Sequence, residues 1–236
     1  MVDSVISIRI PDAHSWHFPR LNQTLPYSSL SSRIKSFFTD LDISQAEGFG
    51  LFIPHILSIF QNNSNAPSLQ SNDPILVFAQ PLVLDMAGAC LNRQPLRILA
   101  CAEALIGLGA GLTPSGDDFL GGLLFALKIL RIAYPTLPFV NFEIPIESFR
   151  SRTHLISFTL LNDLKDGHAI APLHSIINGL LSGVSLEKIS PFVSQLTQVG
   201  HSTGWDLLAG LLTGLLVTYQ SNDFISSFQM TQRLEA

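Results

Sequence analysis

Residues that could perform chemistry gather in one glycine-rich stretch, Gly107-Leu-Gly-Ala-Gly-Leu-Thr-Pro-Ser-Gly-Asp-Asp118, which separates two apolar segments. Its glycines permit positive φ and let a ligand approach the backbone closely. A helix that starts here exposes unpaired N–H groups, which attract anions. We expect Ser115 to cap this helix and Asp117 and Asp118 to lie in its first turn. The alternative is an ordinary helix connection whose aspartates only complement the helix dipole.

The same helix start recurs near the end of the chain. Residues 115–127 and 203–215 are identical at seven of thirteen positions. The identical pairs are Gly116/Gly204, Asp118/Asp206, Leu120/Leu208, Gly122/Gly210, Leu123/Leu211, Leu124/Leu212 and Leu127/Leu215. Small residues along both segments permit close contact between helices. We therefore expect a pseudo-symmetric helix pair that brings Asp118 and Asp206 to one pocket.

The candidate site residues come from these two segments. The candidates for catalysis are Asp117, Asp118, Asp206 and His201. The candidates for ligand binding are Gly109, Gly111, Thr113, Ser115, Gly116, Ser202, Thr203 and Gly204. A single histidine in a helical protein usually has a structural role, but His201 directly precedes the second helix start, so a functional role is equally open.

Such a pocket contains a conflict, because helix starts attract anions and three carboxylates repel them. A divalent cation such as Mg or Mn could lie between the carboxylates and the ligand. The aspartates could instead turn inward and brace the loop through backbone hydrogen bonds. In a third arrangement they accept hydrogen bonds from an amide or amino group, so an amide-bearing anion would suit both halves of the pocket. The residues alone leave these alternatives open.

The two motifs, Gly107 to Leu120 and Gly200-His-Ser-Thr-Gly-Trp-Asp-Leu-Leu-Ala-Gly210, resemble the signatures of the AllH family. This family includes a subunit of oxamate carbamoyltransferase from anaerobic allantoin breakdown, a purine degradation route. The family usually has proline where this chain has Ala110. The resemblance implies a multi-subunit enzyme that moves a carbamoyl group between phosphate and oxamate, forming or splitting oxalurate.

On this hypothesis, backbone N–H groups around Gly109, Gly111 and Gly116 stabilise negative charge on carbamoyl phosphate, oxamate or a similar ligand. Asp118 and Asp206 orient the attacking NH2 group, and His201 carries a proton. Two alternatives come from other classes of protein. One is a non-catalytic ligand-binding or scaffolding subunit. The other is a metal-dependent hydrolase that uses the aspartate cluster as oxygen ligands for Mg or Mn.

The elements that must position these residues are read from hydrophobic periodicity. Apolar residues from Leu30 to Leu41 have helical spacing. Beyond residue 80 the pattern predicts helices near 82–92, 95–107, 116–133, 147–164, 168–182, 185–199 and 203–220. Strand-like runs at Val5 to Ile10, Phe49 to Ile53 and Pro74 to Ala79 predict strands before that point.

The expected fold class is α+β, with a small β-containing N-terminal part packed on a larger, mainly helical C-terminal part. Residues 1–80 form the mixed part in this prediction, and residues 81–236 form the helical domain that carries both glycine and aspartate loops.

Composition narrows the possible partners. Only 13% of the 236 residues are charged and the net charge is −5, which disfavours nucleic-acid binding. The apolar runs are too short or too interrupted to predict a membrane span. Two cysteines give no disulfide framework, and we expect a cytoplasmic protein with a reduced, buried pair. The shortage of charge favours other protein subunits or a homo-oligomer as partners, besides a small-molecule substrate.

Overall fold

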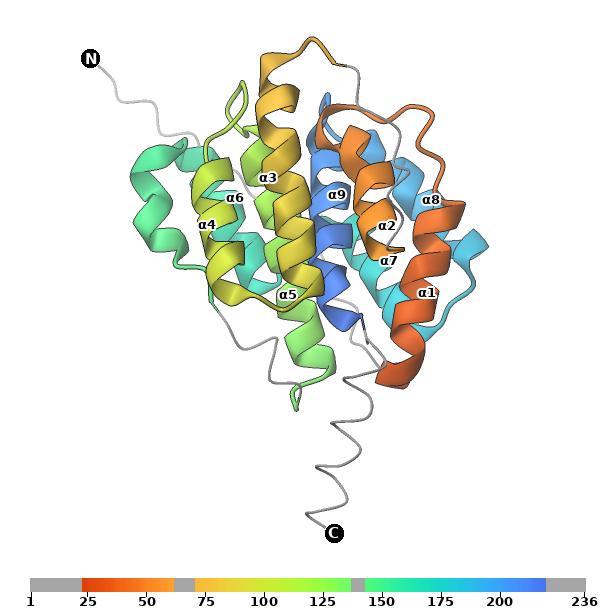
Figure 1. The fold of residues 1–236 in the computed structure, drawn as a ribbon. Coiled ribbons are helices and arrows are strands. Elements are labelled where there is room, and N and C mark those ends of the chain that lie inside the picture. The colour runs from red at the N-terminus through yellow and green to blue at the C-terminus, as the bar shows by residue number, and fades with distance from the viewer. Residues whose placement is uncertain (1–22, 62–70, 137–142, 220–236) are drawn as a thin grey trace, which may run out of the picture.

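The structure, a computed structural model, describes residues 23–61, 71–136 and 143–219. Every regular element in these ranges is a helix (Figure 1). The α-helices are α1 (Tyr27–Asp40), α2 (Ile53–Phe60), α3 (Pro74–Leu91), α4 (Pro95–Leu105), α5 (Ser115–Ala133), α6 (Leu155–Asp166), α7 (Ala171–Ser182), α8 (Leu186–Thr197) and α9 (Thr203–Leu215). Short 3₁₀ helices are η1 (Gly48–Phe52), η3 (Ile146–Arg152) and η4 (Leu216–Thr218).

Helices α5 and α9 form the centre of the molecule. Residues 116–127 of α5 and 204–215 of α9 are buried on all sides, whereas the outer helices bury only one face. The two helices run parallel, and both begin at the upper end of the bundle in Figure 1. A helix that is apolar around its whole circumference belongs in a core. The expected helix pair is therefore present, with the other helices packed around it.

The prediction of an α+β fold is wrong for the described residues, which contain no strand. Phe49 to Ile53 forms η1 and the first residue of α2. Pro74 to Ala79 forms the first turns of α3, where Asp73 caps the helix by accepting a hydrogen bond from the Ile75 N–H at 2.8 Å. A short apolar run suits a buried helix as well as a strand, so the cap and the proline at the first helical position decide between them. The predicted strand Val5 to Ile10 lies outside the described residues.

Helix α3 is apolar on part of its exposed face as well, where Val77 and Phe78 are more than half exposed. Residue 80, the expected domain boundary, lies inside this helix. By length and composition alone, α3 would suffice to cross a membrane, and among the described residues no other helix would. One face of α3 packs in the hydrophobic core through Leu76, Val83 and Met86, and a core helix of a soluble protein passes the same test.

Candidate functional site

The contact between α5 and α9 is pseudo-symmetric. A Cβ atom added to Gly122 would lie 2.1 Å from the carbonyl oxygen of Leu207, and one added to Gly210 would lie 1.9 Å from that of Phe119. In the repeat, Gly122 corresponds to Gly210 and Phe119 corresponds to Leu207, so each of these two contacts is the counterpart of the other. Only glycine allows the two backbones to approach so closely. The repeat in the sequence is therefore a repeat in space, and it places the two helix starts next to each other.

Both helix starts pack on the end of the preceding helix in the same way. A Cβ atom at Gly116 would meet the carbonyl oxygen of Leu105 in α4, and one at Gly204 would meet that of Leu196 in α8. The N–H groups of both glycines donate hydrogen bonds within their own loops, to Leu108 O at 2.8 Å and to Val199 O at 3.0 Å. These two donors, which we expected to face a ligand, are therefore occupied.

Asp117 braces the first loop. Its Oδ1 accepts a hydrogen bond from the Gly107 N–H at 2.6 Å. Its Oδ2 accepts hydrogen bonds from Ser157 Oγ at 2.5 Å and from the Thr153 hydroxyl. The side chain is almost fully buried. Asp117 thus ties the glycine loop to the start of α6, which corresponds to the inward arrangement among the three alternatives.

Asp206 has an equally complete set of partners. Its Oδ1 accepts a hydrogen bond from the Phe49 N–H at 2.6 Å, and its Oδ2 accepts one from Ser202 Oγ at 2.8 Å. Burial raises the pKa of Asp206 to about 6, although these donors and His201 oppose the shift. Sequence reasoning missed Phe49. The signal for this contact in the sequence was Gly48, the residue before Phe49. Its φ is +53° and its Cβ position is next to Asp206, so the position requires glycine.

Asp118 is the exception among the three aspartates. Its side chain is only 7% exposed, yet Oδ2 has no hydrogen-bond partner among the described residues. Burial raises the pKa of Asp118 to about 8, and the nearby Asp206 and Asp117 carboxylates raise it further. The hydroxyls of Thr203 and Thr113 oppose this shift. One buried carboxyl oxygen at the helix starts therefore lacks a partner.

The first hydroxyl of each helix acts on the aspartate of the other helix. Thr203, which begins α9, lowers the pKa of Asp118, and Ser115, which begins α5, lowers that of Asp206. Neither hydroxyl caps its own helix, and Pro114 rather than Ser115 holds the N-cap position of α5. The expectation of a Ser115 cap was therefore wrong. The hydroxyls join the two starts into one polar cluster.

The loop before α5 retains backbone donors. Within the described part of the chain, the N–H groups of Gly109 and Gly111 form no hydrogen bond. Gly109 has a φ of 127° and lies against the Ser115 backbone, so this turn requires glycine. Nothing lies within 4 Å of the Cβ position at Gly111. These two donors can serve an anion, in contrast to those of Gly116 and Gly204.

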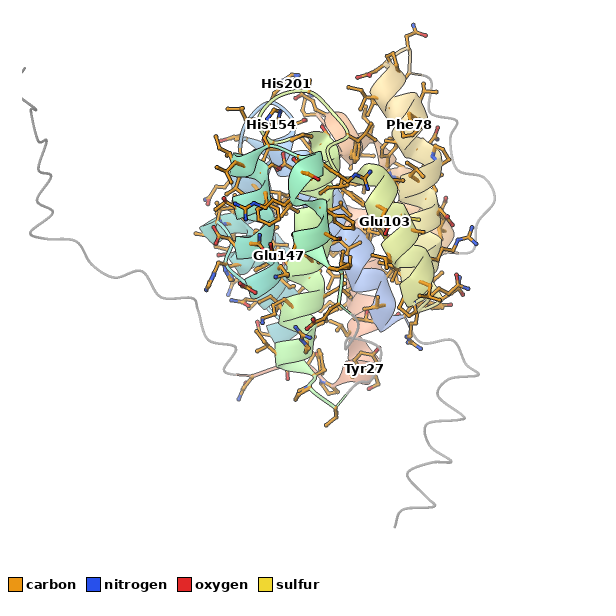
Figure 2. The ribbon with its side chains drawn as sticks, turned by 90° about the vertical axis from the view of Figure 1, so that its left-hand side faces the viewer. Tyr27, Phe78, Glu103, Glu147, His154 and His201 are labelled. Carbon is orange, nitrogen blue, oxygen red and sulfur yellow. The ribbon has the colours of Figure 1, made fainter. Side chains whose placement is uncertain are left out.

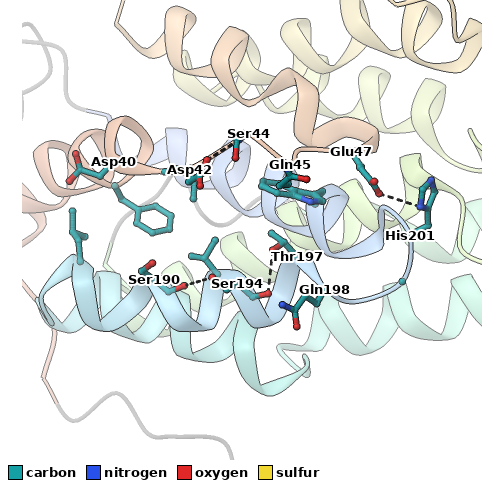
Figure 3. A pocket seen from close by; sticks show the side chains of 16 residues that line it. Asp40, Asp42, Ser44, Gln45, Glu47, Ser190, Ser194, Thr197, Gln198 and His201 are labelled. Carbon is teal, nitrogen blue, oxygen red and sulfur yellow. Dashed lines mark hydrogen bonds and ion pairs between the residues drawn. The ribbon is translucent and has the colours of Figure 1, made fainter.

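His201 lies at the upper end of the molecule (Figure 2), and its charge lowers the pKa of Asp206. Its side chain is 92% exposed, and Nδ1 lies 3.2 Å from a carboxylate oxygen of Glu47. The histidine borders a groove of about 600 Å³ between residues 40–47 and α8 (Figure 3). Asp40, Asp42 and Glu47 line one side of this groove, and Ser190, Ser194 and Thr197 lie on the other. His201 therefore faces the groove rather than Asp118.

The aspartate cluster does not fit a divalent metal ion. Both oxygens of Asp117 and of Asp206 already accept hydrogen bonds from N–H or O–H groups. Only Asp118 offers a carboxyl oxygen without a donor, and a single such oxygen is a poor site for Mg or Mn, which are held by several oxygen ligands. In the ranges that the structure describes, no group of three or more potential metal ligands occurs.

Fold and site together define a protein whose described residues are all-helical in their regular structure, built around two parallel central helices whose polar starts share one cluster. Residues 105–215 match the family model described as oxamate carbamoyltransferase subunit AllH. This confirms the resemblance inferred from the sequence. The match runs from the end of α4 to the end of α9, so both helix starts and all three aspartates lie inside it. No solved structure matches the chain.

Proposed function

We propose that the chain is a subunit of a multi-subunit carbamoyltransferase and binds a small amide-bearing anion, such as oxamate or carbamoyl phosphate, where α5 and α9 begin. The observation that carries this proposal is the unpartnered Oδ2 of Asp118, located inside the segment that matches the family. A buried polar atom without a partner is costly, so such atoms often mark a place where a ligand completes the hydrogen bonding.

The site residues divide by role in this proposal. Asp118 contacts the ligand, and the N–H groups of Gly109 and Gly111 bind its negative charge. Asp117 and Asp206 hold the two starts in position because their oxygens are occupied. His201, exposed at the groove and able to act on the charge of Asp206, is proposed as a proton carrier.

Exposed apolar side chains support the proposed association with other subunits. Val77 and Phe78 on α3 are more than half exposed, and Leu155 and Ile156 at the start of α6 are as well. Phe78 projects from the outer side of α3 in Figure 2. Exposed apolar side chains that neighbour one another and form a contiguous patch commonly mark protein interfaces. We further propose a cytoplasmic location, consistent with two buried free cysteines.

The test is the variant Asp118→Ala in a reconstituted complex that synthesises or splits oxalurate. Loss of a group that contacts the reacting ligand should lower turnover by about 100-fold or more. Asp163→Ala removes an exposed carboxyl from α6 and should leave turnover unchanged. Circular dichroism spectra should be the same for both variants and the unchanged protein, which checks that the variants fold. Turnover of Asp118→Ala close to that of the unchanged protein would refute the proposed site.

A non-catalytic subunit is the competing function, and the exposed apolar faces of α3 and α6 favour it as well. The same reconstitution separates the two. A scaffolding subunit would lose turnover when its apolar faces are changed, for example by Phe78→Ser, but would tolerate Asp118→Ala. A catalytic subunit would lose turnover with Asp118→Ala even when the complex assembles normally by size-exclusion chromatography.

A further inference from the structure

The three aspartates at the helix starts have very different supplies of hydrogen-bond donors. Asp117 accepts from one N–H and two hydroxyls, and Asp206 accepts from one N–H and one hydroxyl. Asp118 is also buried and interacts with the hydroxyls of Thr113 and Thr203, but its Oδ2 accepts from none of the described residues. Donors stabilise a carboxylate, so the negative charge belongs on the two braced aspartates.

A proton on Asp118 follows from the same geometry. An ionised oxygen buried without a donor is strongly unfavourable, and two carboxylates nearby add repulsion. The start of α5 favours negative charge, as do the hydroxyls of Thr113 and Thr203. Burial outweighs them and places the pKa of Asp118 at about 8, above that of Asp206 at about 6. The ionisable groups that act on Asp118 are Asp117 and Asp206, and His201 acts on Asp206.

We propose that Asp118 is the protonated member of the cluster and donates a hydrogen bond from Oδ2 to an oxygen of the bound anion. This inference rests on the proposed function and gives the ligand an orientation. The oxygen end of the ligand, a carboxylate or a carbonyl, faces Asp118, and the amide nitrogen points elsewhere. The expectation from sequence was the reverse, with the ligand NH2 group facing this aspartate.

A neutral Asp118 resolves the conflict between the helix starts and the carboxylates. Asp117 and Asp206 remain charged, but their oxygens accept hydrogen bonds from other groups of the protein, which weakens the repulsion between these carboxylates and the ligand. The remaining carboxyl then attracts an anion rather than repelling it. The site therefore selects ligands with an acceptor oxygen, and it needs no cation between ligand and protein.

The test is calorimetric titration of oxamate into the reconstituted complex containing the full chain, from pH 6.5 to 9. Oxamate stays a singly charged anion over this range, so protons exchanged on binding come from the protein. Two buffers of different ionisation enthalpy report the number of protons exchanged. If the ligand binds the protonated form of Asp118, affinity should fall about tenfold between pH 7 and pH 9. Proton uptake should rise toward one per site as the pH passes 8.

The variant Asp118→Asn keeps an N–H donor at this position but cannot titrate. It should bind oxamate at pH 7 nearly as well as the unchanged protein, with an affinity that does not change up to pH 9. Asp118→Ala should bind weakly at every pH. Asp163→Asn, on the exposed side of α6, should retain the full pH dependence.

The outcomes separate this inference from the proposed function. Oxamate binding with proton release, or with no proton exchange, would overturn the protonated role of Asp118 and leave the site itself in place. Binding that is lost in Asp118→Asn but not in the control would assign an acceptor role and also overturn the inference. Absence of oxamate binding at any pH would overturn both proposals.

Discussion

The two helix starts have the same framework but different surroundings. In both, a glycine packs on a carbonyl oxygen of the preceding helix, and a second glycine packs on the backbone of the partner helix. The connection before α5 spans residues 106–114, whereas that before α9 spans only 198–202. The longer loop is braced by Asp117, and the matching position in the second copy is Trp205, which packs against Gly50.

This difference determines which hydrogen-bond partners the two equivalent aspartates, Asp118 and Asp206, have. In the second copy η1 covers Asp206 and supplies the Phe49 N–H. No described segment does the same for Asp118, whose Oδ2 stays without a donor. The symmetric part of the molecule thus provides the helix contact, and the asymmetric part leaves one of two matching carboxyls with an oxygen that has no partner among the described residues.

The largest expected effects come from the shared framework. Gly122→Ala and Gly210→Ala each place a methyl group about where a backbone oxygen of the other helix lies. We expect each variant to lower the free energy of unfolding by about 3 kcal/mol or more, because the two backbones must separate. Denaturant unfolding measures both values, which should be similar because the contacts are symmetric.

Gly88→Ala is the matched control for these two substitutions, since nothing lies within 4 Å of its Cβ position in α3. It should stabilise the protein by about 0.5–1 kcal/mol through helix propensity. If Gly210→Ala behaved like Gly88→Ala, the close contact of α5 and α9 would be wrong.

The second effect separates the two aspartates. Asp206→Ala leaves the Phe49 N–H buried without an acceptor, so we expect a loss of about 2–3 kcal/mol in the free energy of unfolding. Asp118→Ala removes Oδ2, which has no donor, and interactions with the Thr113 and Thr203 hydroxyls only, so it should cost less, about 1 kcal/mol. Equilibrium unfolding at pH 7 gives both values. Equal losses would show that the two carboxyls are not distinguished by their partners.

The sequence was sufficient to predict the helix pair because its signals are local and occur twice. Residues 115–127 and 203–215 carry both the apolar period and the glycines of the contact. The partners of the aspartates were not predictable in this way, because Phe49 and Ser157 come from distant segments and have no spacing relation to Asp206 or Asp117. The raised pKa of Asp118 was not predictable either, because it results mainly from burial by the surrounding fold.

The N-terminal part shows a different limit of sequence analysis. Phe49 to Ile53 and Pro74 to Ala79 were assigned as strands because they are short and apolar. Both become helical because the tertiary structure surrounds them with apolar helices, and because Asp73 and Pro74 start α3. Periodicity cannot separate a short buried strand from the beginning of a buried helix.

The smallest effect is a difference in pH dependence. The pKa of Asp118, about 8, is above its value in an unfolded chain, so the folded state binds the proton more tightly. The stability that this proton provides is complete below about pH 4 and is lost as the pH rises to about 8. Between pH 6 and pH 8 this loss amounts to about 2 kcal/mol. Asp118→Asn should lack it, whereas Asp206→Asn should retain most of it, because burial rather than the Asp206 charge is the largest cause of the raised pKa of Asp118. Denaturant unfolding at pH 6, 7 and 8 measures the three proteins, and parallel curves for Asp118→Asn and the unchanged protein would place the proton elsewhere in the cluster.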